Sequence, residues 1–272
     1  MLIIKVLDVL LPQGSLLGPY LFGVFISTLY PMFATSCMVK YVDYVCLVSR
    51  IRKSLFKTDI QELIQEIDHI AHWSASNGLQ LNDSKTTGLV KYRGNFKDTC
   101  NLDIHVPGVK FEPRVRFLGV ILDDKFRWTS HVSHIEKKCS QRIYILRRMK
   151  TVASTSECHM IYNGLIRGLL EYASPAFIGL SVGESKILQK IQRRCMKVIG
   201  ANHNIVEDLD WRRRTLAVKL FKNLELQQTS IKDLVTPPLR SGRPAVVPCK
   251  SLLRQRSFFP FMSVLVSESC TE

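Results

Sequence analysis

The chain has 272 residues, of which 46% are hydrophobic, and a formal net charge of +15. This length holds one full-sized domain or two small ones, and the apolar content excludes general disorder. The charge favours a polyanionic partner, either nucleic acid or an anionic membrane surface, over a basic soluble protein without such a partner.

Cysteine and histidine spacing does not predict a metal site. None of the eight cysteines forms a C-x-x-C pair, and no Cys/His cluster has zinc-site spacing. His131 and His134 share a helix face without a third ligand nearby in sequence, so packing or solvent exposure is expected. Residues 1–11 lack the features of a signal peptide. We therefore expect reduced thiols in an intracellular protein of the nucleus or cytoplasm that is not secreted.

No charged residue occurs from Val9 to Val39, a stretch long enough to span a bilayer. Pro19 and Pro31 leave only about three turns of uninterrupted helix between them. The pattern predicts a fully buried helix that begins near Pro19 and ends before Pro31. A membrane span over residues 9–39 is the alternative.

The next segments predict a hairpin, a long helix and short strands. Met38–Val42 and Val45–Ser49 are rich in β-formers, which places Asp43 and Tyr44 at a hairpin tip. Apolar residues at helical spacing then run from 56 to 71, and Asn77-Gly78 ends that helix. Strands are expected at residues 79–81, 87–92, 104–106 and 117–122.

The pattern becomes helical from about Ser130, and a further helix is expected at about 184–199. The second helix has apolar residues on one side and cations on the other, at Lys190, Arg193, Arg194 and Lys197. These cations form either an ordinary solvated face or a contact with a nucleic-acid backbone. Strands with helices followed by helices alone predict an α+β fold with a helical second part.

Two motifs indicate chemistry when they are taken together. Residues 12–19 read Pro-Gln-Gly-Ser-Leu-Leu-Gly-Pro, where Gly14 allows close approach to a ligand that Gln13 and Ser15 can hydrogen-bond. About 25 residues later stands Tyr41-Val42-Asp43-Tyr44, although a lone Asp at a hairpin tip is more often a turn former. In this order the motifs resemble reverse transcriptases of non-LTR retrotransposons. The resemblance continues at Trp73, Asn77–Leu79, Lys85-Thr86, Phe117–Val120, Trp128, Leu170–Ser174, Ile191–Arg194 and Arg256–Pro260.

The resemblance implies an incomplete polymerase palm, an antiparallel sheet with helices, over residues 1–125. An all-helical thumb over 126–200 and a basic, partly disordered extension over 201–272 would follow. The expected reaction is DNA synthesis on an RNA template from a DNA primer, with Mg²⁺. By resemblance, Asp43 binds metal and Lys85 acts as an acid toward pyrophosphate. The nucleotide and template would contact Gln13, Gly14 and Ser15, and the primer grip would be Phe117, Leu118 and Gly119.

The carboxylates for that reaction are incomplete in this sequence. Two Mg²⁺ ions require hard oxygen ligands, which the family supplies from two strands. Asp8 is the one acid before Pro12 and lies too close to Gln13 to match, while Tyr44, a poor Mg²⁺ ligand, replaces the second hairpin carboxylate. We therefore predict a catalytically inactive fragment of an RNA-directed DNA polymerase. The alternatives are a non-catalytic nucleic-acid-binding remnant and a membrane-associated protein spanning with residues 9–39.

Overall fold

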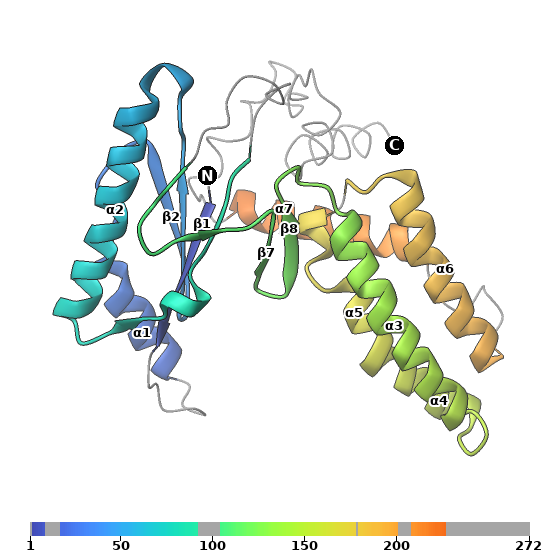
Figure 1. Ribbon diagram of the computed structural model, residues 1–272. Coiled ribbons are helices and arrows are strands. Elements are labelled where there is room, and N and C mark those ends of the chain that lie inside the picture. The colour runs from blue at the N-terminus through green and yellow to red at the C-terminus, as the bar shows by residue number, and fades with distance from the viewer. Residues whose placement is uncertain (1, 9–16, 92–103, 178, 201–207, 227–272) are drawn as a thin grey trace. The chain divides into compact units, whose positions relative to one another are not determined.

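The computed structural model describes residues 2–8, 17–91, 104–177, 179–200 and 208–226 (Figure 1). The chain divides into two compact units, residues 1–127 and 128–272. In the described residues, all strands belong to the first unit and the second is helical. This is a mixed, α+β arrangement, as the sequence predicts.

The main sheet of the first unit has the strand order β2-β3-β1-β5-β6. Its strands are β1 (Leu2–Asp8), β2 (Ser36–Tyr41), β3 (Tyr44–Ser49), β5 (Thr87–Leu89) and β6 (Lys110–Phe111). Short β4 (Gln80–Leu81) also pairs with β1. All pairs are antiparallel except β5 with β6. The hairpin of β7 (Arg114–Phe117) and β8 (Val120–Asp123) forms a separate two-stranded sheet.

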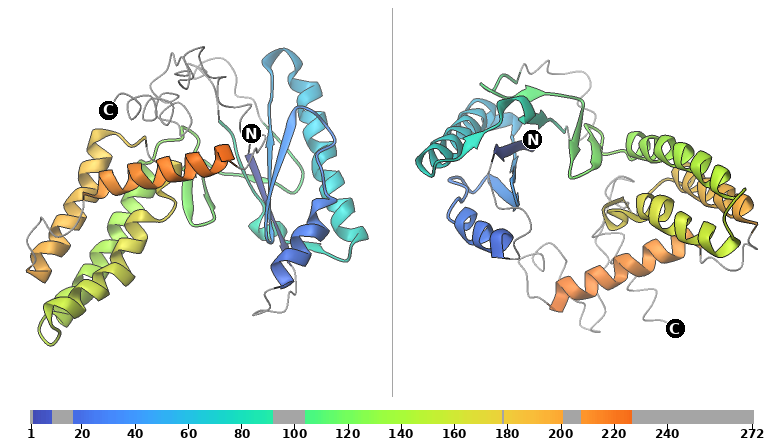
Figure 2. Two further views of the ribbon diagram at one scale, coloured as in Figure 1. Left: turned by 180° about the vertical axis from the view of Figure 1, so that it is seen from behind. Right: turned by 90° about the horizontal axis from the view of Figure 1, so that it is seen from below.

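Two helices, α1 (Leu17–Ser27) and α2 (Phe56–Ser76), cover one face of the main sheet (Figures 1 and 2). The amphipathic pattern of α2 directs its apolar side chains toward Val45 and Leu47 of β3, which share one face because side chains alternate along a strand. The buried core of this layer is Phe22, Ile26, Leu29, Val45, Leu47, Leu63, Ile67, Ile70 and Val106.

The opposite face of the sheet is only partly covered. Leu89 of β5 is buried with Val115 of the β7–β8 hairpin, and Tyr44 and Phe117 pack against this pair. Toward the β2 edge, Val39 is 51% exposed and Val48 is 41% exposed. The sheet therefore has one closed face and one face that is open beside β2 and β3.

The second unit contains α3 (Thr129–Met149), α4 (Thr155–Tyr162), a π-helical turn (Asn163–Arg167), α5 (Gly168–Glu171), α6 (Val182–Ile199) and α7 (Leu209–Leu226). Helix α6 begins with a capping box between Ser181 and Glu184 and ends at Gly200, whose φ of 80° suits a glycine C-cap. A second capping box begins α4 at Ser154. Apolar side chains from α3 to α7 form one buried core that includes Ile135, Cys139, Leu188, Ile191, Cys195 and Leu209.

Several predicted strands are wrong in position. Residues 104–106 form no strand, and β5 ends at Leu89 instead of 92. The segment 117–122 is not one strand but the end of β7, a turn at Leu118-Gly119, and most of β8. The turn could not be predicted from the continuous apolar run 117–122, because Leu118 adopts a positive φ that is rare for a leucine.

One further expectation was wrong. Helix α1 is not fully buried: only Phe22 and Ile26 lie inside, while Tyr20 is 77% and Val24 is 71% exposed. An apolar composition indicates burial only when other elements cover every side of a helix, and here the sheet and α2 cover one. The range 201–272, which is predicted to be a basic, partly disordered extension, includes the helix α7. Residues 201–207 and 227–272 lie outside the described residues.

In the part of the chain that the structure describes, no helix supports the alternative prediction of a membrane span over residues 9–39. None of those helices combines the length and the apolar character needed to cross a bilayer. Helix α1 has 11 residues, and residues 9–16 of the uncharged stretch lie outside the described ranges. Cys37, Cys46, Cys139, Cys158 and Cys195 carry no disulfide.

Candidate functional site

The hairpin between β2 and β3 presents Asp43 at its tip. Tyr41 pairs with Tyr44, so the two turn residues are Val42 and Asp43, one position earlier than predicted. Val42 has a φ of 49°, which is rare for a β-branched residue. The tip is therefore a strained turn that ends with the half-buried Asp43, and Tyr44 is the first residue of β3.

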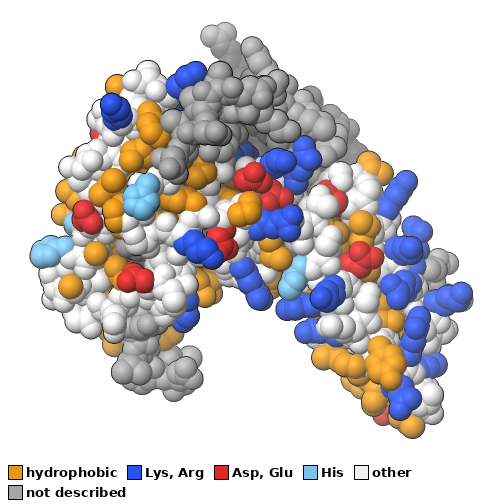
Figure 3. Space-filling view, viewed as in Figure 1, with side chains coloured by type: hydrophobic (Ala, Val, Ile, Leu, Met, Phe, Trp, Pro, Cys, Tyr) orange, Lys and Arg blue, Asp and Glu red, His pale blue; other side chains and the backbone are white. Residues whose placement is uncertain are grey.

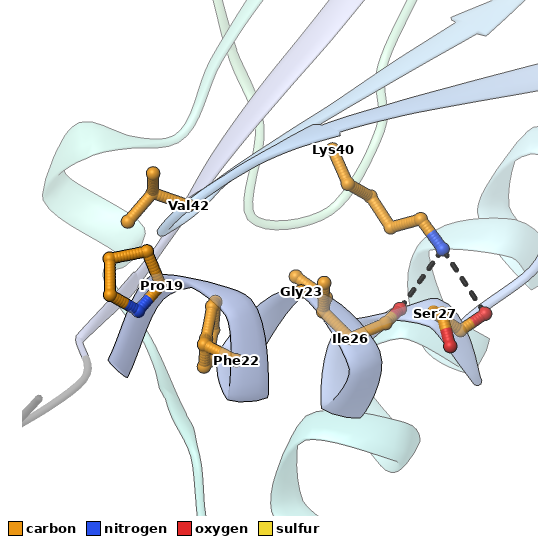
Figure 4. Close-up of a pocket in the computed structure, with 7 residues that line it drawn as sticks. All are labelled: Pro19, Phe22, Gly23, Ile26, Ser27, Lys40 and Val42. Atoms are coloured by element: carbon orange, nitrogen blue, oxygen red, sulfur yellow. Dashed lines mark hydrogen bonds between the residues drawn. The ribbon is translucent and has the colours of Figure 1, made fainter. Parts of the chain in front are cut away.

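Lys40 fixes this hairpin to the end of α1. Its Nζ donates hydrogen bonds to the carbonyl oxygens of Ile26 at 2.9 Å and Ser27 at 3.3 Å (Figure 4), and to that of Leu29 at 2.5 Å. These carbonyls at the end of a helix have no partner within the helix, and a cation is favoured there. Burial lowers the pKa of Lys40. Lys40 was not predicted as a site residue. Its position as a single cation in an otherwise apolar strand is the sequence feature that could have indicated it.

A cavity of about 250 Å³ lies between α1 and the hairpin. Figure 4 shows Pro19, Phe22 and Gly23 on α1 facing Val42 and the stem of Lys40. Its lining also includes Ile26 and Ser27. The cavity thus adjoins the turn that holds Asp43.

Strand register brings the Lys85 segment to the same end of the sheet as Asp43. Strand β1 pairs with Tyr44 at Val6 and with β4 at residues 7 and 8. Strand β5 resumes the pairing opposite residue 4, so residues 82–86 loop out opposite residues 5 and 6. Two strand spacings, about 10 Å, separate the backbones on either side of β1. Lys85 is exposed within a short 3₁₀ helix, and Asn82 accepts a hydrogen bond from its backbone N–H.

Residues Phe117, Leu118 and Gly119 lie at the end of the β7–β8 hairpin. Phe117 pairs with Val120 around the two-residue turn Leu118-Gly119, where both φ angles are positive as in a type I′ turn. The Phe117 ring contacts the Tyr44 ring edge-on, with centroids 6.1 Å apart. Tyr44 therefore packs against the expected primer-grip residue, so its side chain has a structural role beside Asp43.

The remaining predicted contacts of this site are outside the described residues. Gln13, Gly14 and Ser15 belong to the range 9–16. Within the described ranges, no group of three or more His, Cys, Asp or Glu side chains could hold a metal ion. Asp43 alone supplies a carboxylate at the hairpin tip, and a hard cation such as Mg²⁺ would need further oxygen ligands.

The helical unit carries a separate candidate interface on α6. Lys190, Arg193 and Lys197 are exposed on this helix, and Arg194 is half-buried. The opposite side of α6 is packed in the core through Leu188, Ile191 and Cys195. Lysine and arginine side chains gather over the helical unit in the space-filling view (Figure 3). The cations thus form an outward face whose geometry depends on the buried stripe.

His131 is buried among aromatic rings and is not part of a metal site in the described residues. It is 3% exposed and contacts Phe177 edge-on at a centroid distance of 5.0 Å, with Trp128 at 6.4 Å. Burial lowers the pKa of His131 to about 4, and the charge of His134 adds to this effect. Of the two expected roles, packing and solvent exposure, the structure gives His131 the first.

Comparison with known proteins finds similarity of the first unit to one family and of the chain to two relatives. Residues 5–122 match the model of the family described as reverse transcriptase (RNA-dependent DNA polymerase). The chain is 23% identical over 145 residues to the RNA-directed DNA polymerase from mobile element jockey of Drosophila funebris. It is 22% identical over 230 residues to the probable RNA-directed DNA polymerase from transposon X-element of Drosophila melanogaster. The resemblance to reverse transcriptases is confirmed.

The chain is similar to only a part of each relative's length. The two alignments cover 52% and 82% of this chain, but only 16% and 25% of the relatives. No solved structure matches. The hairpin with Asp43, the loop with Lys85 and the Phe117 turn all fall within residues 5–122, which match the family model.

Proposed function

We propose that residues 1–125 form a partial polymerase palm, that residues 126–200 form its thumb, and that this chain binds nucleic acid without polymerising DNA by itself. The observation that carries the proposal is the hairpin tip. Asp43 is presented there at a strained turn, and Tyr44 packs against Phe117 instead of offering a second carboxylate. The same proposal assigns Lys85 to the pyrophosphate and the Phe117 turn to the primer. It assigns Gln13, Gly14 and Ser15 to the nucleotide and the template.

The chemistry requires more carboxylates than this tip supplies. Two divalent ions align the primer hydroxyl and the leaving pyrophosphate, and carboxylates from two strands normally hold them. Strand β1 lies directly beside β3, and its last residue is Asp8. The pairing of Val6 with Tyr44 brings the end of β1 to the level of the hairpin tip. The short spacing between Asp8 and Gln13 nevertheless argues against Asp8 as a second ligand, and substitution of Asp8 tests this exclusion directly.

Primer extension tests the catalytic part of the proposal. The chain is given an RNA template, a DNA primer, deoxynucleoside triphosphates and Mg²⁺ or Mn²⁺, and we expect no template-dependent product. The variants are Asp43→Ala and Asp8→Asn, with Asp68→Ala on the exposed side of α2 as the control. Product that Asp43→Ala abolishes and Asp68→Ala leaves unchanged would overturn the proposed inactivity. Loss of that product in Asp8→Asn would identify the missing ligand.

Nucleic-acid binding is assigned to the exposed face of α6. Cations that contact phosphates release counterions, so the affinity should fall steeply with salt and depend little on base identity. If all four of Lys190, Arg193, Arg194 and Lys197 contact phosphates, the log–log slope should be about −3 to −4. An intracellular location, in the nucleus or cytoplasm, follows from a nucleic-acid substrate.

Fluorescence anisotropy across a salt series tests this assignment. One variant replaces the four α6 cations with Gln, which leaves the buried stripe of the helix unchanged. A charge-matched control replaces four exposed lysines of the first unit, at positions 53, 57, 110 and 125. We expect the slope to flatten in the α6 variant and to persist in the control. Equal slopes in the two variants would mean that α6 is only a solvated surface.

A further inference from the structure

Helix α7 buries a guanidinium whose charge is only partly compensated. Arg213 is 3% exposed, and its Nη2 donates a hydrogen bond to the carbonyl oxygen of Phe177 at 3.0 Å. Its guanidinium carbon lies 4.9 Å from the centroid of the Phe177 ring. The Nε atom is buried without a hydrogen-bond partner. A buried cation is costly unless it is paired and hydrogen-bonded, so this site has unused capacity for an anion.

The carboxylate that pairs with Arg213 among the described residues is already engaged by other donors. Asp210 accepts hydrogen bonds from the Ser185 hydroxyl at 2.9 and 2.7 Å, and from the Gln189 amide at 2.7 Å. Its distance to Nη1 of Arg213 is 3.6 Å, which is an ion pair without close contact. Desolvation outweighs this attraction and lowers the pKa of Arg213. Asp210 therefore neutralises the guanidinium incompletely.

A cavity of about 290 Å³ lies between α6 and α7 at this point. Besides Arg213 it is lined by two exposed cations, Lys186 and Arg214, together with Asp210. Three cations against one carboxylate leave a formal charge of +2 at its wall. The volume is that of a small-ligand site, and Lys186 lies one helical turn before Lys190 of the exposed α6 face.

We propose that this cavity binds a single phosphate group, held by Arg213, Lys186 and Arg214. A phosphate carries a charge that balances the excess of +2 and offers oxygen atoms to several donors, and a guanidinium fork suits it geometrically. The phosphate can belong to a nucleic acid or be free in solution. The site goes beyond the binding assigned to the exposed α6 face, because it needs one phosphate and no duplex.

Calorimetric titration of the full chain with inorganic phosphate, at constant ionic strength, tests the site. The variant Lys186→Gln/Arg214→Gln removes the two cations at the cavity rim and leaves the buried Arg213 in place. Its matched control is Lys137→Gln/Lys219→Gln, on α3 and α7, at exposed positions that do not line the cavity and do not belong to the α6 face. We expect saturable binding that weakens by about tenfold or more in the rim variant and is unchanged in the control. Absence of saturable binding, or an equal loss in both variants, would overturn the proposal.

Oligonucleotides with and without a 5′-phosphate then distinguish the source of the phosphate. A terminal phosphate that strengthens binding only when the rim is intact identifies an end-binding site. Equal binding of the two oligonucleotides, with a shallower salt slope in the rim variant, identifies a backbone phosphate. Oligonucleotide binding that the rim variant leaves unchanged identifies free phosphate. The α6 variant with four Gln residues keeps Lys186, so it should still bind inorganic phosphate even if nucleic-acid binding by α6 fails.

Discussion

Protonation of His131 should destabilise the helical unit at mildly acidic pH. The imidazole is buried against Phe177 and Trp128, and burial, with a smaller effect of His134, lowers its pKa from 6.5 to about 4. The folded state therefore keeps His131 neutral, while the unfolded chain takes up a proton as the pH falls below 6.5.

The sign and the size of the effect follow from this difference. Above pH 6.5 both states are neutral at this position, and the stability is unaffected. Between pH 6.5 and about 4, the unfolded state binds more protons and the free energy of unfolding falls. The loss is about 2 kcal/mol at pH 5 and approaches about 3 kcal/mol below pH 4.

Urea denaturation followed by circular dichroism at 222 nm, at pH 7.5 and pH 5, measures this loss. The variant His131→Phe keeps an aromatic ring and removes the titrating group, and His159→Gln on α4 is the control. The lowered pKa of Glu157, held by the Ser154 capping box, affects stability only below its ordinary value of 4.5, outside this window. We expect the pH effect to shrink by about 2 kcal/mol in His131→Phe alone. Equal pH effects in the wild type and His131→Phe would refute the reasoning.

Four further substitutions test the packing and the hairpin tip. Gly23→Ala should stabilise α1 by up to about 1 kcal/mol, because a Cβ there meets no atom within 4 Å. Gly88→Ala should reduce the stability by about 1–3 kcal/mol, because its Cβ would lie 2.4 Å from a ring atom. Thermal unfolding of both variants compares the two positions. Glu171→Gln should cost about 2 kcal/mol in urea denaturation, because Glu171 accepts a 2.6 Å hydrogen bond from the buried Arg212; an unchanged midpoint would show that this ion pair does not contribute to stability. Tyr44→Asp should not produce primer extension, because it removes a packed ring and supplies no ligand from a second strand; template-dependent product would contradict the assignment of ligands.

Local patterns in the sequence were sufficient for the long helices and for the order of the motifs. The apolar stripes of α2, α3 and α6 repeat every three or four residues, and such periodicity specifies a helix and its buried side without knowledge of the partners. Asn77-Gly78 marked the end of α2 correctly, since Gly78 has the positive φ of a helix-terminating glycine. The segments that resemble reverse transcriptases were recognised for the same reason, because a motif is a local property of the chain.

Only the tertiary structure determined where the strands pair and what covers each surface. Strand β1 became the central strand between β3 and β5, and this depends on hydrogen bonds to segments about 40 and 80 residues away. The same register moved the hairpin tip to Val42-Asp43 and turned Tyr44 toward Phe117. Exposure of α1 and burial of Arg213 likewise depend on which elements pack nearby, and periodicity within one segment carries no information about that. The sequence by itself thus determined which chemistry-bearing residues are present, while long-range pairing and packing decided which of them meet.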